Sequence, residues 1–304
     1  MINAPGIQRS CPVCQANHAA PFLHKEGLDL VRCDQCSMVY ASPVPAEFVS
    51  GRYYDEAGPG YYLSPAKLES DYADVRFERE LSLFRRHCQA GTVLDVGCSS
   101  GAFLYQLTRR HPGNYRVLGT DVSTAPLDYA ASKGVPVARG DFLELPLHDF
   151  DAVTFWAVLE HLADPARFLE KAASALKPGG LCFALVPNLD SLAVRLIGAS
   201  YRYFYPQHLN YFTARTLSRM AAPWFETVEI RTTHFNPIVI WQDWRQAGRP
   251  VSNEERAALL KRTTAYKQNP LLKPAKELYQ LSERLLSATG LADNLALVFR
   301  KTGR

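Results

Sequence analysis

The chain has 304 residues, of which 47% are hydrophobic and 21% charged, and its net charge is +4. This is the composition of an ordinary globular protein, long enough for a full α/β core and a smaller module, and its scattered Lys and Arg residues do not indicate a nucleic-acid partner. The first residues lack an apolar signal segment, and no run of about 18 apolar residues occurs, so we expect a cytoplasmic protein without a membrane span.

Four cysteines near the N-terminus form two pairs, Cys11-x2-Cys14 and Cys33-x2-Cys36, separated by 18 residues. Two such knuckles are typical of a structural zinc site, in which four thiolates complete a tetrahedral shell. Disulfides are the alternative, but an expected cytoplasmic location disfavours them. We therefore predict a zinc-ribbon module at residues 1–45, in which structural Zn²⁺ folds a segment too small to be stable alone.

Residues 46–90 are expected to link this module to the rest of the chain. Four tyrosines lie there among glycines, namely Tyr53, Tyr54, Tyr61 and Tyr62. The segment is interpreted as a strap packed across two domains, or alternatively as a lid over a site. From residue 66 to about residue 87, an apolar stripe amid charges predicts a single helix that leads into the first strand.

Residues 92–104, TVLDVGCSSGAFL, predict a strand, a tight turn and a helix. Gly97 and Gly101 permit a positive φ or the close approach of a ligand, and the new helix directs free N–H groups into the same space. Asp95 adds a negative charge at the end of the strand. This charge suits a cationic ligand better than a pyrophosphate.

Four more strands follow, at about residues 116–120, 135–138, 150–156 and 181–186. Asp121 follows the first of them, where a parallel sheet presents a carboxylate to a ribose diol, although an Asp there also caps helices. A helix is predicted between the last two strands, with Asp164 as its cap and Lys-Pro-Gly-Gly as its end. Alternating strands and helices of this kind predict an α/β fold.

The arrangement closely resembles the class I S-adenosylmethionine-dependent methyltransferases of the ubiquinone-biosynthesis O-methyltransferase type, over about residues 91–225. The first motif is Asp95-x-Gly97-x-Ser99-x-Gly101, in which Ser99 replaces the family's middle glycine. The others are Leu-Glu-His-Leu at 159–162, Asp-Pro at 164–165, Leu-Lys-Pro-Gly-Gly at 176–180 and Pro-Asn at 187–188. The resemblance implies a Rossmann-like seven-stranded sheet within a domain at residues 91–304, with the last strand, 294–301, antiparallel between the fifth and sixth.

The resemblance also implies that S-adenosylmethionine is the methyl donor. In the family, an acid after the third strand binds the adenine amino group and an apolar neighbour packs on the ring, and Asp141 and Phe142 match these positions. The expected donor-binding residues are Asp95, Gly97, Cys98, Ser99, Gly101, Asp121, Asp141, Phe142 and Trp156.

Methyl transfer from a sulfonium requires alignment of donor and acceptor and, for a hydroxyl acceptor, removal of a proton. His161 follows Glu160 just beyond the fourth strand and is one candidate base. Alternatively, this pair only shapes the entry to the next helix. A divalent metal on Glu160 and His161 is disfavoured because no third ligand is visible.

The second candidate base is His208, in the aromatic stretch YRYFYPQHLNYF at residues 201–212. Related methyltransferases cover the acceptor pocket with Pro-x-His-Leu-x-Phe-Phe, which this stretch matches except that Tyr211 replaces the first Phe. We favour His208 as base or acceptor-positioning residue, the alternative being a histidine that only holds the loop. The expected acceptor-binding residues are Glu160, Arg202, Tyr203, Tyr205 and Tyr211, with Arg202 meeting an anionic group.

The chain continues with a helix at 213–222, a sixth strand at 224–232 and a helical insertion at about 236–291. Apolar stripes predict helices at 253–268 and 272–288, which form a lid, a homodimer face or surface helices.

Relatives that combine a four-cysteine module with this core often act on sugars, glycans or secondary metabolites. We therefore expect methylation of a small-molecule acceptor, with a hydroxyl oxygen slightly favoured over carbon or nitrogen. An RNA or protein methyltransferase is an alternative, although the module carries few basic residues. Another is a non-catalytic binding module on the same fold.

Overall fold

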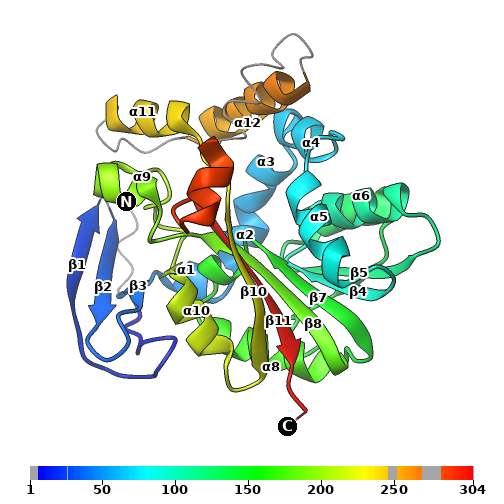
Figure 1. The fold of residues 1–304 in the computed structure, drawn as a ribbon, viewed down its shortest axis with the longest axis horizontal. Coiled ribbons are helices and arrows are strands. Elements are labelled where there is room, and N and C mark those ends of the chain that lie inside the picture. Colours follow the sequence, from blue (N-terminus) through cyan, green and yellow to red (C-terminus); the bar gives the residue numbers. More distant parts are fainter. Residues whose placement is uncertain (1–5, 26, 246–251, 269–281, 304) are drawn as a thin grey trace.

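The computed structural model describes residues 6–25, 27–245, 252–268 and 282–303 (Figure 1). Its larger sheet has the strand order β10-β11-β8-β7-β4-β5-β6. These strands are β4 (Gly91–Val96), β5 (Tyr115–Asp121), β6 (Val137–Arg139), β7 (Phe150–Trp156), β8 (Leu176–Pro187), β10 (Phe225–Thr233) and β11 (Asn294–Lys301). Strands β4 to β8 are parallel, while β11 runs antiparallel between β8 and β10. The predicted seven-stranded Rossmann-like sheet is confirmed, including its inserted last strand.

Helices cover both faces of this sheet (Figure 1). One apolar layer involves α5 (Glu78–His87), α6 (Ala102–Arg110) and α7 (Thr124–Ser132), and the other involves α8 (Pro165–Ala175) and α10 (Ala214–Ala221). Asp164 caps α8, and Thr213 caps α10 in a capping box with Thr216, because each side chain accepts a hydrogen bond from an otherwise unpaired backbone N–H. In the described part of the chain, no helix has the length and apolar character needed to span a bilayer.

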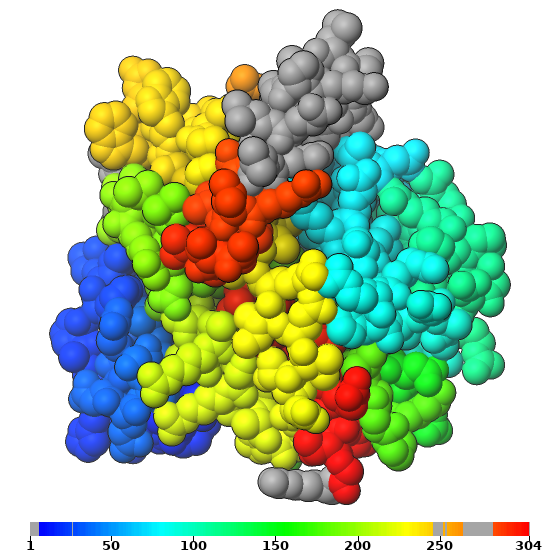
Figure 2. All heavy atoms as spheres, in the orientation of Figure 1, coloured from blue at the N-terminus to red at the C-terminus, as the bar shows by residue number. Residues whose placement is uncertain are grey.

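A second, four-stranded antiparallel sheet contains the N-terminal module. Its order is β1 (Ala19–Lys25), β2 (Leu28–Cys33), β3 (Val39–Ala41) and β9 (Asn210–Tyr211). Strand β9 comes from the aromatic stretch predicted over the acceptor, so the module and that stretch share one sheet. Met38 and Tyr40 belong to the same apolar cluster as Leu94 of β4. Figure 2 shows the blue module packed directly against the green segment that follows β8.

The linker is helical from its start, whereas the sequence predicted a helix only from residue 66. It forms α1 (Ala46–Val49), α2 (Arg52–Glu56), α3 (Gly58–Tyr62) and α4 (Pro65–Asp71). The single helix predicted from 66 to 87 is wrong, since the chain leaves the helix after α4 and resumes it at α5, with Phe77 in the left-handed region at φ 60°. The amide of Gln106 on α6 donates to the carbonyls of Tyr72 and Ala73, at 3.0 and 3.1 Å, and so pairs carbonyls that the break frees.

The insertion before β11 contains α11 (Pro237–Arg245), which was not predicted, and α12 (Asn253–Gln268), which was. Helix α11 lacks a single apolar stripe, because Ile238, Trp241 and Trp244 are exposed while Val239 and Ile240 are buried. Of the second predicted helix, residues 282–288 are helical, and residues 272–281 lie outside the described residues. A short helix, α9 (Leu192–Ile197), follows β8.

Candidate active site

The turn after β4 has the conformation that its small residues suggested. Gly97, Ser99 and Gly101 have φ values of 72°, 50° and 76°. A Cβ atom on Gly97 would lie 2.6 Å from a Val158 methyl group, so this glycine also lets the loop after β7 approach the turn. Ser99 occupies the left-handed region although it is not glycine, and its backbone N–H donates to Asp121 Oδ2 at 2.8 Å. This hydrogen bond offsets the conformational cost of replacing the family's middle glycine.

Two carboxyl groups, the buried Asp95 and the half-buried Asp121, lie at the ends of neighbouring strands. Asp95 accepts a hydrogen bond from Thr154 Oγ1 at 2.6 Å, and Asp121 Oδ1 accepts one from the Ser123 N–H at 2.8 Å. Burial raises the pKa of Asp95 to about 7, and burial also raises the pKa of Asp121 against the opposing effect of the Ser123 and Ser99 N–H groups. No ion pair with a described basic residue neutralises either acid. The pair therefore fits a cationic ligand that bears a diol.

The linker helices contribute contacts to this donor region that the sequence did not reveal. Asp55 of α2 accepts a hydrogen bond from the Thr124 N–H at 2.8 Å, at the first turn of α7. The Tyr72 hydroxyl donates to the Ser100 carbonyl at 2.6 Å and so holds the turn after β4. The linker thus lies over the carboxyl edge of the sheet as well as connecting the two sheets.

The other predicted donor residues occupy different places. Asp141 is exposed and accepts a hydrogen bond from the Leu143 N–H, while Phe142 is buried between Phe155 and Phe168. The Trp156 ring packs on the opposite face of the sheet, with its centroid 5.1 Å from that of Phe103. Cys98 is buried against Gly119 of β5. Contact of these side chains with a donor stays a prediction.

His161 lies in a 3-10 turn, Leu159–His161, directly after the loop that approaches Gly97. Its Nδ1 is 2.9 Å from the Gln207 carbonyl and 3.0 Å from the Tyr54 hydroxyl. Because a carbonyl only accepts, Nδ1 carries the proton and Nε2 carries the lone pair. No hydrogen bond from the described residues reaches Nε2, and burial lowers the pKa of His161 to about 4.

His208 is buried next to His161, with ring centroids 4.7 Å apart. Its Nδ1 donates to the Tyr203 carbonyl at 3.0 Å, so its Nε2 must accept from the Tyr205 hydroxyl at 2.8 Å. Burial, reinforced by the neighbouring His161, lowers the pKa of His208 well below its usual value. Both nitrogens of His208 are therefore engaged, unlike those of His161.

Glu160 completes the cluster. Glu160 is 1% exposed, and this burial raises the pKa of its carboxyl group to about 8. Its Oε1 lies 3.9 Å from His161 Nε2, and its Oε2 has no described hydrogen-bond partner. The ligand-capable atoms of Glu160, His161 and His208 lie within 4.8 Å of one another. Two imidazoles held through Nδ1 by backbone carbonyls and one carboxylate can coordinate a divalent cation, provided that the Tyr205 hydroxyl gives up its hydrogen bond to His208 Nε2. His208 is thus the third group that was not visible from the sequence.

Asn210 of β9 joins three parts of the molecule and was missed in the sequence. Its amide donates to the Leu159 and Leu162 carbonyls, at 2.9 and 2.7 Å, on either side of the Glu160–His161 pair. Its oxygen accepts from the Arg9 guanidinium of the N-terminal module at 2.9 Å. The backbone N–H of Leu209 also donates to the Glu160 carbonyl at 2.7 Å. Asn210 and Leu209 thus place His208 beside His161.

The aromatic stretch surrounds His208 as expected, but Arg202 is already paired. Tyr205 and Tyr203 contact the His208 ring, and Tyr211 stacks on Phe204 at a centroid distance of 5.0 Å. The Arg202 guanidinium forms a salt bridge with Asp243 of α11, with Nη2 2.6 Å from Oδ1, and that carboxylate is 2% exposed. The charge expected to meet an anionic acceptor is therefore neutralised within the protein.

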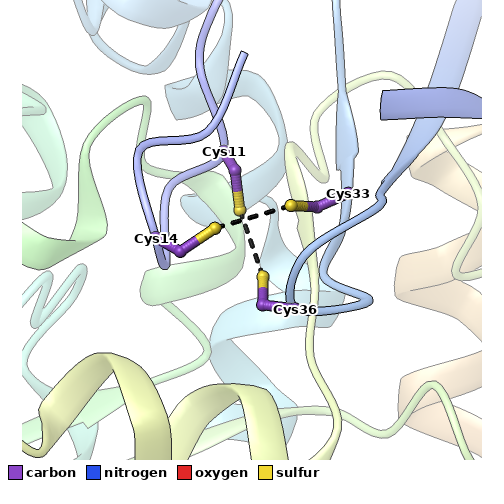
Figure 3. A group of neighbouring side chains, drawn as sticks. All are labelled: Cys11, Cys14, Cys33 and Cys36. Carbon is purple, nitrogen blue, oxygen red and sulfur yellow. Dashed lines mark hydrogen bonds between the residues drawn. The ribbon is translucent and has the colours of Figure 1, made fainter. Parts of the chain in front are cut away.

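The four N-terminal cysteines converge on one point (Figure 3). The Sγ atoms of Cys11 and Cys36 are 3.4 Å apart, and those of Cys14 and Cys33 are 3.5 Å apart. Four thiolates around zinc, at about 2.3 Å each, require a similar tetrahedral spacing, so this donor set fits the ion. Burial of the Cys33 thiol is outweighed by the N–H groups of Cys36 and Gln35, which lower its pKa.

A seven-stranded sheet with an inserted antiparallel last strand and an acid-bearing glycine turn after β4 defines the class I S-adenosylmethionine-dependent methyltransferases. A family model described as a methyltransferase domain matches residues 70–222, half of the chain. The chain therefore belongs to this methyltransferase-domain family.

Among curated relatives, the ubiquinone biosynthesis O-methyltransferase of Caulobacter vibrioides is 30% identical over 169 residues, 50% of this chain and 66% of that protein. The match thus spans just under two thirds of the relative. The enzyme of the same name from Xanthomonas campestris is 27% identical over 230 residues, 68% of this chain and 87% of that protein.

Solved structures agree on the fold. A Thermotoga maritima methyltransferase described as a possible histamine N-methyltransferase has a TM-score of 0.51 at 18% identity, covering 84% of this chain and 100% of that one. The [4+2]-cyclase SpnF has a TM-score of 0.53 at 17% identity, covering 86% and 98%. Since one of these is named a cyclase, the fold by itself does not identify the acceptor or the reaction.

Proposed function

We propose that this enzyme transfers a methyl group from S-adenosylmethionine to a small molecule, a hydroxylated sugar, glycan or secondary metabolite, with oxygen favoured as the methylated atom. The observation that carries the proposal is the approach of two sites. Val158, next to the Glu160–His161 pair, packs against Gly97 in the donor turn. The acids that suit the donor and the histidines that suit a proton transfer thus share the carboxyl edge of the sheet.

The donor, when bound, supplies a methyl group on a sulfonium that is already activated for displacement. Asp121 would bind its ribose, and the buried Asp95 would lie near its positive charge. His161 would then accept the proton of the acceptor hydroxyl through Nε2, the nitrogen that lacks a described hydrogen bond. His208, whose two nitrogens are engaged, would hold the aromatic wall and position the acceptor. This assignment favours His161 over His208 as the base.

Calorimetric titration with S-adenosylhomocysteine tests the donor site directly. We expect micromolar binding to the wild type and a loss of at least 100-fold in Asp121→Ala, because the carboxylate that would accept two hydrogen bonds from the ribose hydroxyls disappears. Asp128→Ala, at an exposed ion pair on α7, is the matched control and should bind normally. Binding that survives Asp121→Ala would contradict this donor site.

An acceptor screen follows, in which released S-adenosylhomocysteine is detected with hydroxylated sugars, glycans and phenols. Turnover that requires His161 supports the proposal. The protein could instead bind the donor and turn over RNA, protein or amines but no hydroxyl acceptor. That outcome would contradict the proposed acceptor class and identify another. Donor binding with turnover on none of them would favour the non-catalytic binding module.

We further propose that Zn²⁺ occupies the four-cysteine site and stabilises the N-terminal module, residues 1–45, as a structural ion. Elemental analysis of the purified protein should find one zinc per chain, and Cys14→Ser should lose it. Cys88→Ser, a buried cysteine outside the cluster, should retain it. Iron or no metal in well-folded protein would contradict the assignment.

We also propose the division into this module, a linker at 46–90 and a catalytic domain at 91–304, and a homodimer formed through the C-terminal helices. Sedimentation velocity checks the dimer. A single species at 34.0 kDa, the mass of one chain, would exclude it.

A further inference from the structure

Arg256 of α12 reaches the aromatic stretch from the helical insertion. Its Nη2 donates to the Tyr205 hydroxyl at 3.0 Å, and its guanidinium carbon lies 4.5 Å from the Tyr205 ring centroid and 5.3 Å from that of Tyr61. The helix is held in this position by buried Ala257 and by an ion pair of Lys261 with Glu69 of α4, at 2.8 Å. A cation from a sequence-distant helix therefore lies beside the predicted acceptor wall.

The Tyr205 hydroxyl connects this cation to the histidines. It accepts from Arg256 and donates to His208 Nε2 at 2.8 Å, and the His161 ring follows 4.7 Å further on. Since two hydrogen bonds share one oxygen, the guanidinium and the His208 imidazole are less than about 6 Å apart. One small molecule can span this distance. A ring with a hydroxyl at one position and a charged group at another has the required size.

Arg256 has no acidic partner among the described residues, and the one hydrogen bond of its guanidinium there goes to the Tyr205 hydroxyl. Arg202 is neutralised by Asp243, and Arg9 is bound to Asn210 and the Leu209 carbonyl. Within the ranges that the structure describes, no carboxylate forms an ion pair with Arg256. A half-buried guanidinium flanked by two phenol rings loses part of its hydration, so a bound anion would be favourable there.

We propose that Arg256 binds an anionic substituent of the acceptor, a carboxylate or a phosphate, and so orients the acceptor hydroxyl toward His161. The inference rests on the proposed methyl transfer and narrows its substrate to acidic small molecules. A guanidinium forms two parallel hydrogen bonds with either anion, which gives orientation as well as affinity. It also transfers to Arg256 the role that the sequence suggested for Arg202.

The test uses the full-length protein saturated with S-adenosylhomocysteine and labelled with ¹⁵N-arginine. Side-chain N–H signals are followed by NMR during titration with inorganic phosphate and, separately, with acetate, and the Arg256 signal is identified by its absence in Arg256→Gln. We expect saturable shifts of this signal at millimolar anion. Arg262, exposed on the same helix, is the internal control and should show only small, non-saturating shifts.

The two anions distinguish the two chemistries, since a preference for acetate points to a carboxylate and a preference for phosphate points to a phosphate ester. An Arg256 signal that shifts no more than that of Arg262 with both anions would overturn the proposal. Donor binding is measured in the same samples. Its absence would show that the proposed function has failed, whereas donor binding without an anion response would show that only the role of Arg256 has failed.

With an acceptor in hand, Arg256→Gln should raise KM by roughly 10- to 100-fold, as expected for the loss of charge-assisted hydrogen bonds, and leave the affinity for S-adenosylhomocysteine unchanged. Arg256→Lys keeps the positive charge but not the guanidinium's two parallel N–H donors, so its KM should lie between those of the wild type and Arg256→Gln. Equal KM values in the wild type and Arg256→Gln, or a natural acceptor without negative charge, would overturn the proposal even if one variant folds poorly.

Discussion

His161 and His208 differ at Nε2. That nitrogen has no described hydrogen-bond partner in His161, whereas in His208 it accepts from the Tyr205 hydroxyl. The pattern of residue types identified both His161 and His208 and favoured His208. The proposed preference for His161 depends on two carbonyls, of Gln207 and Tyr203, that only the folded loop brings near. Arg256 was not identified at all. Nothing in its local sequence indicates that α12 carries it to Tyr205, and only the tertiary packing reveals the contact.

His161→Gln should lower kcat by at least 100-fold with little change in KM, because a general base acts mainly in the transition state. His208→Gln should instead raise KM more than it lowers kcat, since His208 is expected to position the acceptor. Steady-state kinetics with one acceptor compare the two variants. Equal kcat values in the wild type and His161→Gln would remove His161 from the proton transfer.

Asp95 should make stability depend on pH. Burial raises its pKa to about 7 in the folded protein, against about 3.9 when unfolded, so between these values the folded state binds more protons and its stability falls as the pH rises. Between pH 5 and pH 8, the decrease in the free energy of unfolding should be smaller in Asp95→Asn than in the wild type, by on the order of 3 kcal/mol. Urea unfolding at both pH values measures it.

Among the elements, β9 connects the N-terminal module to the Glu160–His161–His208 cluster although it is only two residues long. Strand patterns of two residues carry no periodicity, so the sequence predicted neither this strand nor the shared sheet. The seven strands of the larger sheet were predicted from apolar runs or alternation bounded by turn signals, although β6, Val137–Arg139, is only three residues long. The helix predicted from 66 to 87 was wrong because Tyr72 and Gln106 form tertiary contacts at the break that outweigh local propensity.

Asn210→Ala should destabilise the protein by about 2 to 4 kcal/mol, because it leaves two buried carbonyls and the Arg9 guanidinium without their partner. Asn114→Ala, at an exposed turn before β5, should cost less than about 0.5 kcal/mol. Denaturant unfolding gives both values. A loss at Asn210 as small as that at Asn114 would show that β9 does not join the two sheets energetically.

In the whole molecule, the four-cysteine cluster belongs to one structural unit with the aromatic stretch at residues 201–212, the proposed acceptor wall. The turn after β4, residues 97–101, where the donor is proposed to bind, belongs to the larger sheet. Cys33 ends β2, β2 pairs with β3, and β3 pairs with β9, which directly follows His208 and Leu209. Asp95 and Asp121 are positioned by β4 and β5 and do not depend on this ladder. Donor binding and the proposed methyl transfer should therefore respond differently to loss of the proposed zinc.

Removing the proposed zinc with a chelator should abolish the proposed methyl transfer while changing the affinity for S-adenosylhomocysteine by less than about threefold, under 1 kcal/mol. Hydrogen exchange should rise at β3 and β9 and stay slow at β4 and β5. Readdition of zinc is the control for irreversible damage. Equal loss of donor binding and turnover would mean that the cluster supports the whole fold and not the acceptor side alone.

The four-stranded sheet β1-β2-β3-β9 also limits which segments of this protein can be exchanged for those of a relative. A chimaera that exchanges only the first 45 residues would place a foreign β3 beside a resident β9 and a foreign partner opposite Asn210. The exchangeable piece is discontinuous, made of the cysteine-bearing segment together with residues 201–212. Acceptor preference should follow that two-part piece, so crossovers that separate its halves should give folded proteins that bind the donor and methylate nothing.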